Sequence, residues 1–466
     1  MWHIIISTFM IAAVLTAGTA RGQGETRLWE RVRSSDDPRD LEVFLRTYPH
    51  GQYALLARVR IKQLTSRKSA APVRPDPPAL SATSATDPAT PVHDCDRLAA
   101  SPSDKRAVAT AIKFADFDAV AAQEACLQAV SQYPGVPRLE FQLGRALSKL
   151  NRHEEALSHY TKAASMGHVV AAKNIAFTYF KGAPALKDYS KALQWYLKTA
   201  DLGDPSAMRI AGFMYERGLG TSQNFAEANR LYRKAANLND AQAMFNLGSA
   251  YQRGRGVAKN DRVAAQWYRK SAEGGYLKAM FNLGLAYRKG RGVPQNHAEC
   301  ANWMRRAAKQ GHAMAMYVLG GAYFNGQGVR RDARKAHDWW IKAMEKGNPA
   351  PASLLAQMYD RGTGGIRKDP RQGAAYMFQG LKAGKSNAQK QMTTNANGYS
   401  RSFRVELQRL MRRDGSYQGA VDGKFGPATK QAIVALVQKS IAEGRAHGVT
   451  GATGLGLGDS HDLGKF

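Results

Sequence analysis

A 36-residue period runs through the middle of this chain and constrains its fold more than any other feature. One aromatic row of the period consists of Tyr179, Tyr215, Tyr251, Tyr287, Tyr323 and Tyr359. A second row in the same phase consists of Trp195, Leu231, Trp267, Trp303 and Trp339. Two rows of glycines keep the same step. Several rows of residues that all recur with the same period indicate a repeat array. The units of such an array bury their apolar faces by stacking on one another.

The unit at 243–274 predicts a helical hairpin with a glycine loop between its two helices. Leu247 and Tyr251 lie four residues apart, so they share one face of the first helix. Trp267 and Tyr268 are expected on the facing stripe of the second helix. The tyrosine and tryptophan rows are therefore predicted to be structural core and not a platform on which nucleic-acid bases stack.

Turn and capping residues support the same hairpin. Gly254 is expected to end the first helix in a left-handed conformation. Asn260 or Asp261 is expected to cap the second helix. The small side chain of Ala264 is expected to let the two helices approach each other closely.

The pattern A-M-x-x-L-G-x-x-Y-x-x-G-x-G-V, followed by A-x-x-W-Y-x-K, is legible at 243–270 and resembles the Sel1-like repeat, a relative of the tetratricopeptide repeat. The resemblance covers 138–384. It implies an all-α fold, built as a right-handed superhelical solenoid of helix hairpins. It also implies protein partners on the concave face of the solenoid and no catalytic site.

Three segments are expected before the repeats. Residues 25–64 show apolar residues at helical spacing and predict a small helical module, with a helix starting at Asp37-Pro38. Residues 66–92 are rich in Pro, Ala, Ser and Thr, which is typical of an extended linker. Residues 93–137 resemble the helical segment that often precedes Sel1-like repeats.

The first 20 residues predict export. Residues 1–20 combine an apolar core with small residues near Ala20, which is the layout of a secretory signal peptide. No Lys or Arg precedes the apolar core, so an uncleaved N-terminal anchor is the alternative. We therefore expect a periplasmic or secreted protein.

Residues 401–440 resemble a small helical peptidoglycan-binding domain, through a helix followed by V-D-G-K-F-G-P and a second helix. The resemblance implies peptidoglycan as a partner. The residues expected to contact it are Tyr417, Asp422, Lys424 and Thr429. The alternative is a purely structural cap on the solenoid. Residues 441–466 are expected to form a Gly-rich flexible tail.

The three cysteines, Cys95, Cys126 and Cys300, make separate predictions. Export to an oxidising compartment favours a disulfide between Cys95 and Cys126, which flank a presumed helical hairpin. Cys300 stands in a small packing position of its repeat and is expected to be a buried, inert thiol. Three free thiols would be expected if the chain stays in the cytoplasm.

The net charge and the motif content limit the function classes. The chain carries 67 Lys and Arg against 37 Asp and Glu, a formal net charge of +30. Basic residues recur in the hairpin loops, so we expect a basic edge that faces anionic envelope surfaces, or that is simply solvated. The sequence lacks phosphate-binding, nucleophile-elbow and zinc-helix motifs. We therefore expect no enzyme activity, no cofactor, no metal and no nucleic-acid partner.

These features predict a non-catalytic periplasmic scaffold or adaptor. It would bind protein partners through its repeats and attach to peptidoglycan through 401–440. The alternative is a periplasmic signalling regulator that inhibits a membrane sensor, with a vestigial C-terminal motif. An exported effector that acts in a host cell is a further possibility.

Overall fold

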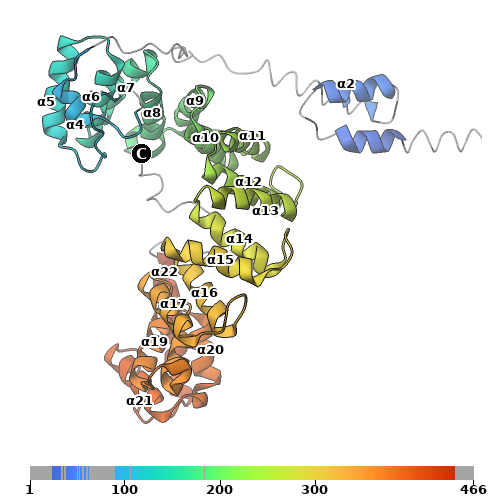
Figure 1. Cartoon of the computed structure of the whole chain (residues 1–466), viewed down its shortest axis with the longest axis vertical. Helices are drawn as coiled ribbons and strands as arrows, with labels where there is room; N and C mark the ends of the chain where they lie inside the picture. Colours follow the sequence, from blue (N-terminus) through green and yellow to red (C-terminus); the bar gives the residue numbers. More distant parts are fainter. Residues whose placement is uncertain are drawn as a thin grey trace, which may run out of the picture. The chain divides into compact units, whose positions relative to one another are not determined.

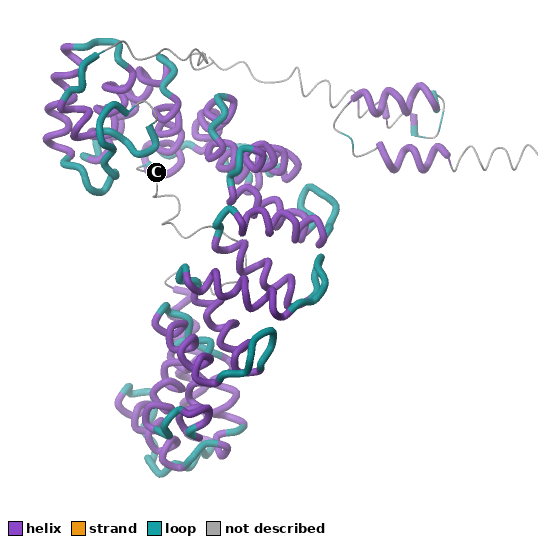
Figure 2. Tube along the Cα trace, in the orientation of Figure 1, coloured by secondary structure: helices purple, strands orange, loops and turns teal. Residues whose placement is uncertain are grey.

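The structure is a computed structural model that describes residues 90–446 except 105, 106 and 183. Nearer the N-terminus it describes 24–32, 35, 38–49, 51, 53, 54, 57, 58 and 61. Within these residues every regular element is a helix, drawn purple in Figure 2, so the predicted all-α fold is confirmed. The expected signal peptide at 1–20 and most of the expected linker lie outside the described residues.

The chain divides into two compact units, 1–79 and 80–466. In the first unit, a helix at 24–32 and α2 (Pro38–Thr47) share a small core. Leu41 and Phe44 of α2 are fully buried there. The ring of Trp29 lies 5.4 Å from that of Phe44, measured between centroids.

The second unit begins with α4 (Asp94–Ala99) and α5 (Ala119–Gln132), joined by turns and bends where the sequence predicted helix. Seven helix hairpins follow one another along the chain (Figure 1). They are α6 (Pro137–Lys149) with α7 (His153–Ser165), α8 (Val169–Lys181) with α9 (Tyr189–Asp201), α10 (Pro205–Arg217) with α11 (Phe225–Asn237), α12 (Ala241–Arg253) with α13 (Asp261–Glu273), α14 (Leu277–Lys289) with α15 (His297–Lys309), α16 (Ala313–Asn325) with α17 (Ala333–Glu345), and α18 (Ala352–Arg361) with α19 (Pro370–Lys382). The helices α20 (Ser386–Thr394), α21 (Arg401–Arg413) and α22 (Pro427–Ala446) complete the unit.

Each hairpin helix starts and stops at residues whose chemistry requires it. Asn260 is the cap of α13, because its side chain accepts a hydrogen bond from the amide of Val263. Asp240 caps α12 in the same way. Gly254 ends α12 in the left-handed region, with φ of +69°, where a residue without a Cβ has no steric penalty.

A ring packed on a glycine sets the distance between the two helices of a hairpin. A Cβ added to Gly248 of α12 would lie 2.7 Å from the ring of Tyr268 on α13 and 3.2 Å from the carbonyl oxygen of Ala264. Gly212 meets Tyr232 in the same way, and Gly320 meets Trp340. The close approach of the two helices, which was predicted from the small side chain of Ala264, therefore also depends on the glycine of the facing helix.

The fully buried aromatic row is not one of the two rows that first revealed the period. It consists of Tyr160, Tyr196, Tyr232, Tyr268 and, after an interruption by Met304, Trp340. In the two predicted core rows, Tyr287, Trp195 and Trp303 are buried, and Tyr179, Tyr215, Tyr251, Tyr323, Tyr359, Trp267 and Trp339 are half-buried. A period marks which positions are equivalent, but it does not say which of two adjacent positions faces inward.

Contacts between hairpins repeat with the same step. A Cβ on Gly256, in the loop after α12, would lie 2.6 Å from the backbone of Phe225 at the start of α11 in the preceding hairpin. Lys173 and Asp204 form an ion pair of 3.0 Å between α8 and the cap of α10. Arg209 and Asp240 repeat this pair one hairpin later at 3.2 Å. Consecutive hairpins thus form a solenoid in which each unit packs against its neighbours.

The C-terminal helices continue the core of the last hairpin. Met377 and Leu381 of α19 share one buried cluster with Phe403 and Leu407 of α21 and with Val437 of α22. Helix α22 runs through Ala446, so it extends into the segment that was expected to be a flexible tail. Residues 447–466 lie outside the described residues.

The glycine pair Gly320 and Gly321 offers a matched test of the hairpin contact. A Cβ at Gly320 would lie 2.4 Å from the Trp340 ring, whereas a Cβ at Gly321 would have no heavy atom within 4 Å. Gly320→Ala should destabilise the fold by about 1–3 kcal/mol through overpacking. Gly321→Ala should stabilise it by about 0.5–1 kcal/mol through helix propensity. Urea unfolding followed by circular dichroism measures both, and equal effects of the two variants would contradict this packing.

Alkaline pH should weaken the fold through the buried tyrosines. Burial raises the pKa of Tyr160 and of Tyr268 to about 12. The contribution of these two neutral side chains to the free energy of unfolding is complete below the unfolded-state pKa near 10. It falls as pH rises from about 10 to 12, by about 2–3 kcal/mol for each tyrosine. Burial lowers the pKa of Arg145 to about 10, so this one group opposes the trend over the same window. Replacing both tyrosines by Phe should flatten the pH dependence of the unfolding midpoint.

Candidate interaction groove

Two pockets lie at the same register of the solenoid, four hairpins apart. The first pocket has a volume of about 240 Å³ and is lined by Lys173, Asn174, Phe177, Thr178, Tyr196 and Ile210, among others. The second pocket has a volume of about 300 Å³ and is lined by Tyr317, Val318, Gly321, Ala322, Trp340 and Leu354, among others. Each residue of the second set follows its counterpart by 144 positions, which is four periods. The surface between neighbouring first helices is therefore hollowed at equivalent places, and we call it the first-helix groove.

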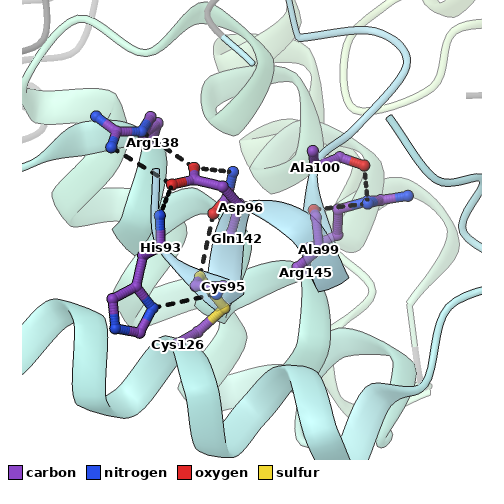
Figure 3. The surroundings of a disulfide bond; sticks show 9 residues. All are labelled: His93, Cys95, Asp96, Ala99, Ala100, Cys126, Arg138, Gln142 and Arg145. Carbon is purple, nitrogen blue, oxygen red and sulfur yellow. Dashed lines mark hydrogen bonds and ion pairs between the residues drawn. A yellow bond between two sulfur atoms is a disulfide. The ribbon is translucent and has the colours of Figure 1, made fainter. Parts of the chain in front are cut away.

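The first pocket is closed at one end by the segment before the repeats. Helix α6 presents Arg138, Gln142 and Arg145 on one face toward α4 (Figure 3). The fully buried carboxylate of Asp96 accepts hydrogen bonds from Arg138 Nε at 3.1 Å and Gln142 Nε2 at 3.0 Å. The backbone amide of His93 donates to the same carboxylate at 3.0 Å. These contacts fix α4 against the first hairpin.

Arg145 connects α4 to the pocket. Its guanidinium donates to the carbonyl oxygens of Ala99 and Ala100 at 2.7 and 2.8 Å (Figure 3), which places a cation at the C-terminal end of a helix. It also donates to Ile112 at 2.7 Å. The guanidinium carbon lies 4.8 Å from the centroid of the Phe117 ring. The guanidinium is nevertheless one wall of the first pocket.

A disulfide joins Cys95 of α4 to Cys126 of α5 beside this network (Figure 3). The two cysteines are fully buried and 31 positions apart in sequence. The side-chain oxygen of Gln142 lies 3.1 Å from the sulfur of Cys95. Cys300 is free and buried, and burial raises the pKa of its thiol, so its reactive thiolate form is disfavoured.

Cations reach the tyrosine row across the contact between hairpins. Arg233 of α11 donates to the hydroxyl of Tyr251 in the next hairpin at 3.0 Å. Arg269 donates to Tyr287 at the equivalent position one hairpin later. His337 and the hydroxyl of Tyr359 lie 2.9 Å apart. These tyrosines therefore link consecutive hairpins through their hydroxyl groups, a role that their period alone did not reveal.

The four candidate peptidoglycan-contacting residues do not form one exposed cluster. Tyr417 and Thr429 are buried, and the Thr429 hydroxyl donates to that of Tyr417 at 3.1 Å. Gln408 is fully buried between them and Lys424, and its amide donates to the Lys424 carbonyl oxygen at 3.0 Å. Asp422 is half-buried and accepts from the Lys424 amide at 2.8 Å. Lys424 is the member of the set whose side chain is exposed.

The expected basic edge lies where the hairpin loops are. Figure 2 shows the loops of the hairpins α12–α13, α14–α15 and α16–α17 on the same side of the stacked hairpins. Arg253 and Lys289, at the ends of α12 and α14, and Lys259 and Arg291, in the loops that follow, are exposed. Arg255 is half-buried and lies 3.5 Å from Glu216, so it is partly neutralised.

Nowhere in the described residues do three His, Cys, Asp or Glu side chains gather as a metal site requires. Among the described helices, none combines the length and apolar character that crossing a bilayer needs.

The cysteine assignment predicts a defined mass-mapping result for protein purified from its native compartment. Non-reducing digestion should give a Cys95–Cys126 linked peptide, and Cys300 should be alkylated only after unfolding because it is buried. Removing the bridge, as in Cys95→Ser with Cys126→Ser, should lower the free energy of unfolding by about 3–4 kcal/mol in the chain-entropy account. Three thiols open to alkylation in the denatured, unreduced protein would contradict both the bridge and the expectation of export.

Comparison with known proteins identifies the repeats. The Sel1 repeat model matches residues 140–168, 169–204, 205–240, 241–276, 277–312, 313–348 and 352–385. A Sel1 repeat protein from Oxalobacter formigenes, known as a crystal structure, is 32% identical over 51% of this chain and 95% of its own, with a TM-score of 0.44. A protective antigen of uropathogenic Escherichia coli strains, which displays an SLR fold, is 22% identical over 74% of this chain and 93% of its own, with a TM-score of 0.48.

An immunity protein from Pseudomonas aeruginosa is 24% identical over 42% of this chain and 74% of its own, with a TM-score of 0.30. No curated protein matches the sequence. The seven repeat matches coincide with the seven hairpins and cover more than half of the chain. The chain belongs to the Sel1 repeat family.

Proposed function

We propose that this protein is a non-catalytic periplasmic adaptor that binds protein partners along the first-helix groove and attaches to peptidoglycan through residues 401–440. Sel1 repeat proteins generally mediate protein–protein interaction, and this supports the first part. The observation that carries it is the recurrence of a pocket at one register, four hairpins apart. A surface hollowed at regular intervals suits an extended polypeptide, which presents side chains at regular intervals.

The groove changes character along its length, which favours a specific partner over a generic one. At the register of Phe177 the following hairpins carry Phe213, Ser249, Leu285 and Gly321. Both large apolar side chains and small ones thus occur at equivalent places. Because the side chains differ in size, each hairpin fits a different side chain of a bound polypeptide, and specificity arises from differences of this kind.

Attachment to the cell wall rests on the resemblance of residues 401–440 and on the exposed cation at Lys424. The stem peptides of peptidoglycan carry carboxylates, which an exposed lysine attracts. The burial of Tyr417 and Thr429 assigns them to the support of the loop that presents Lys424. The periplasmic location in this proposal rests on the layout of residues 1–20, which predicts export.

Site-specific photocrosslinking tests the groove. Ser249 is half-buried and stands at the register of Phe177 and Gly321, which line the two pockets. A photoreactive phenylalanine analogue is placed there because other hairpins carry Phe or Leu at that register. The matched control is the same analogue at Gln266, an exposed position on the second helix of the same hairpin. We expect a discrete crosslinked partner from position 249 and none from position 266 in the native cells. The same adduct from both positions, or from position 266 alone, would contradict groove binding.

Co-sedimentation with purified peptidoglycan tests the C-terminal attachment. Deleting 401–440 would expose the core that it shares with α19, so a charge reversal is the cleaner variant. Lys424→Glu should weaken binding about tenfold, because a hydrogen bond to a charged group contributes about 1.5–3 kcal/mol. Lys430→Glu reverses an exposed charge on α22 and should leave binding unchanged. Wild-type protein that stays in the supernatant, or equal losses in both variants, would refute a specific contact at Lys424.

A further inference from the structure

One buried tyrosine of the repeat core lacks the hydrogen bond that its counterparts make. The hydroxyl of Tyr232 donates to Glu216 at 2.8 Å, and that of Tyr268 donates to Gln252 at 3.1 Å. Both acceptors stand 16 positions before their tyrosine. The corresponding residue for Tyr196 is Phe180, whose ring lies 6.3 Å from that of Tyr196 and offers no acceptor.

Tyr196 also lacks the polar side chain that follows its counterparts 14 positions later. Asn174 interacts with the side chain of Tyr160, and Asn282 with that of Tyr268, each 14 positions after its tyrosine. The corresponding residue for Tyr196 is Ile210. Within the part of the chain that the structure describes, the hydroxyl of Tyr196 therefore has no hydrogen-bond partner, although its side chain is 99% buried, with a relative exposure of 1%.

Tyr196, which carries this unpartnered hydroxyl, is one of the residues that line the first pocket. Phe114, Phe177 and Ile210 supply apolar walls to the same cavity of about 240 Å³. Native proteins pair nearly all buried polar groups, so an unpartnered one that faces a cavity indicates a group that enters the cavity. That group must accept a hydrogen bond from a phenol and must be accompanied by apolar surface.

The charge of the pocket indicates which acceptor fits. Arg145 lines the cavity and is 3% exposed, and its hydrogen bonds go to neutral carbonyl oxygens. No carboxylate forms an ion pair with it in the described part of the chain. Lys173 also lines the cavity, but its ammonium is paired with Asp204. The carboxylate of Asp104 acts on Arg145 electrostatically, and it lies 3.2 Å from the ring nitrogen of His168. Among the described residues, Arg145 therefore has no carboxylate bonded directly to it, and an ionised carboxylate is the acceptor that complements it.

We propose that the first pocket anchors a peptide segment of a protein partner by a carboxylate, which accepts a hydrogen bond from Tyr196 beside Arg145, while an adjacent apolar side chain packs against Phe114 and Phe177. This anchor rests on the proposed function, because it gives one place in the first-helix groove its ligand chemistry. A C-terminal carboxylate and the side chain of an acidic residue share this chemistry. The four-hairpin equivalent of Tyr196 is Trp340, whose ring nitrogen donates to the carbonyl oxygen of Tyr317 at 3.1 Å. The second pocket therefore lacks this donor.

Small peptides test the anchor in the full-length protein. N-acetyl-L-phenylalanine carries the free carboxylate and the ring, and its Kd should be on the order of 1 mM for a ligand of this size. N-acetyl-L-aspartyl-L-phenylalanine amide moves the carboxylate to a side chain, so the tighter binder of the two identifies the source. N-acetyl-L-phenylalanine amide lacks the carboxylate and should bind at least tenfold more weakly. Equal binding of the acid and the neutral amide in NMR titrations, or no saturable binding up to about 10 mM, would overturn the proposal.

Two matched variants test the role of the hydroxyl. Tyr196→Phe should weaken binding of the acidic probe about tenfold, whereas Tyr232→Phe should not change it, because the Tyr232 hydroxyl bonds within its own hairpin. Tyr196→Phe should leave the thermal midpoint unchanged or raise it, since it removes an unpaired buried group, and Tyr232→Phe should lower it. A midpoint lowered equally by both variants would show that Tyr196 has a partner within the fold and would overturn the proposal. Loss of probe binding with intact crosslinking from Ser249 would refute the anchor alone and leave the proposed function standing.

Discussion

The contact between a second-helix ring and a first-helix glycine determines the geometry of the solenoid. In the hairpin of α12 and α13, a Cβ on Gly248 would lie 2.7 Å from the ring of Tyr268 and 3.2 Å from the carbonyl oxygen of Ala264. The two helices therefore approach each other closely at this point. The contact between a ring and a glycine recurs at Gly144, Gly212 and Gly320, whereas Gly284 meets Met304 and Ala176 occupies the equivalent position in α8. Where the contact recurs, it helps the hairpins to stack in register.

That regularity explains why the groove and its pockets recur. The first pocket and the second pocket are lined by residues four periods apart, so the backbone provides equivalent cavities and the side chains differentiate them. Where a tyrosine keeps its acceptor, as Tyr232 does with Glu216, the polar group belongs to the core. Where the acceptor is replaced by Phe180 and Ile210, the hydroxyl of Tyr196 forms no hydrogen bond within the described residues, and Tyr196 lines the first pocket. In the proposed anchor, this small change in one repeat converts a structural group into a binding group.

The repeat and its caps could be predicted from the sequence because period, turn chemistry and capping are local. Gly254 ends its helix as predicted, and of the two predicted caps, Asn260 and Asp261, the structure has Asn260. Trp267 and Tyr268 were both expected on the facing stripe; Tyr268 is buried and Trp267 is half-buried, because packing decides which of two adjacent large side chains lies further inward. Lys270 lies over the Trp267 ring at 4.9 Å, so a long cation covers the aromatic surface that the core leaves open. The buried positions of Tyr417 and Thr429, and the pocket at Tyr196, depend on contacts between distant residues that no local pattern records.

Groove binding by an extended partner is the central claim. Hydrogen exchange of the full-length protein, alone and with the partner captured by crosslinking, tests it most directly, because amide protection reports where the bound chain lies. The account predicts added protection in the first helices α8, α10, α12, α14 and α16, with little change in the second helices. Protection confined to the basic loops or to residues 401–440, with the first helices unchanged, would contradict it.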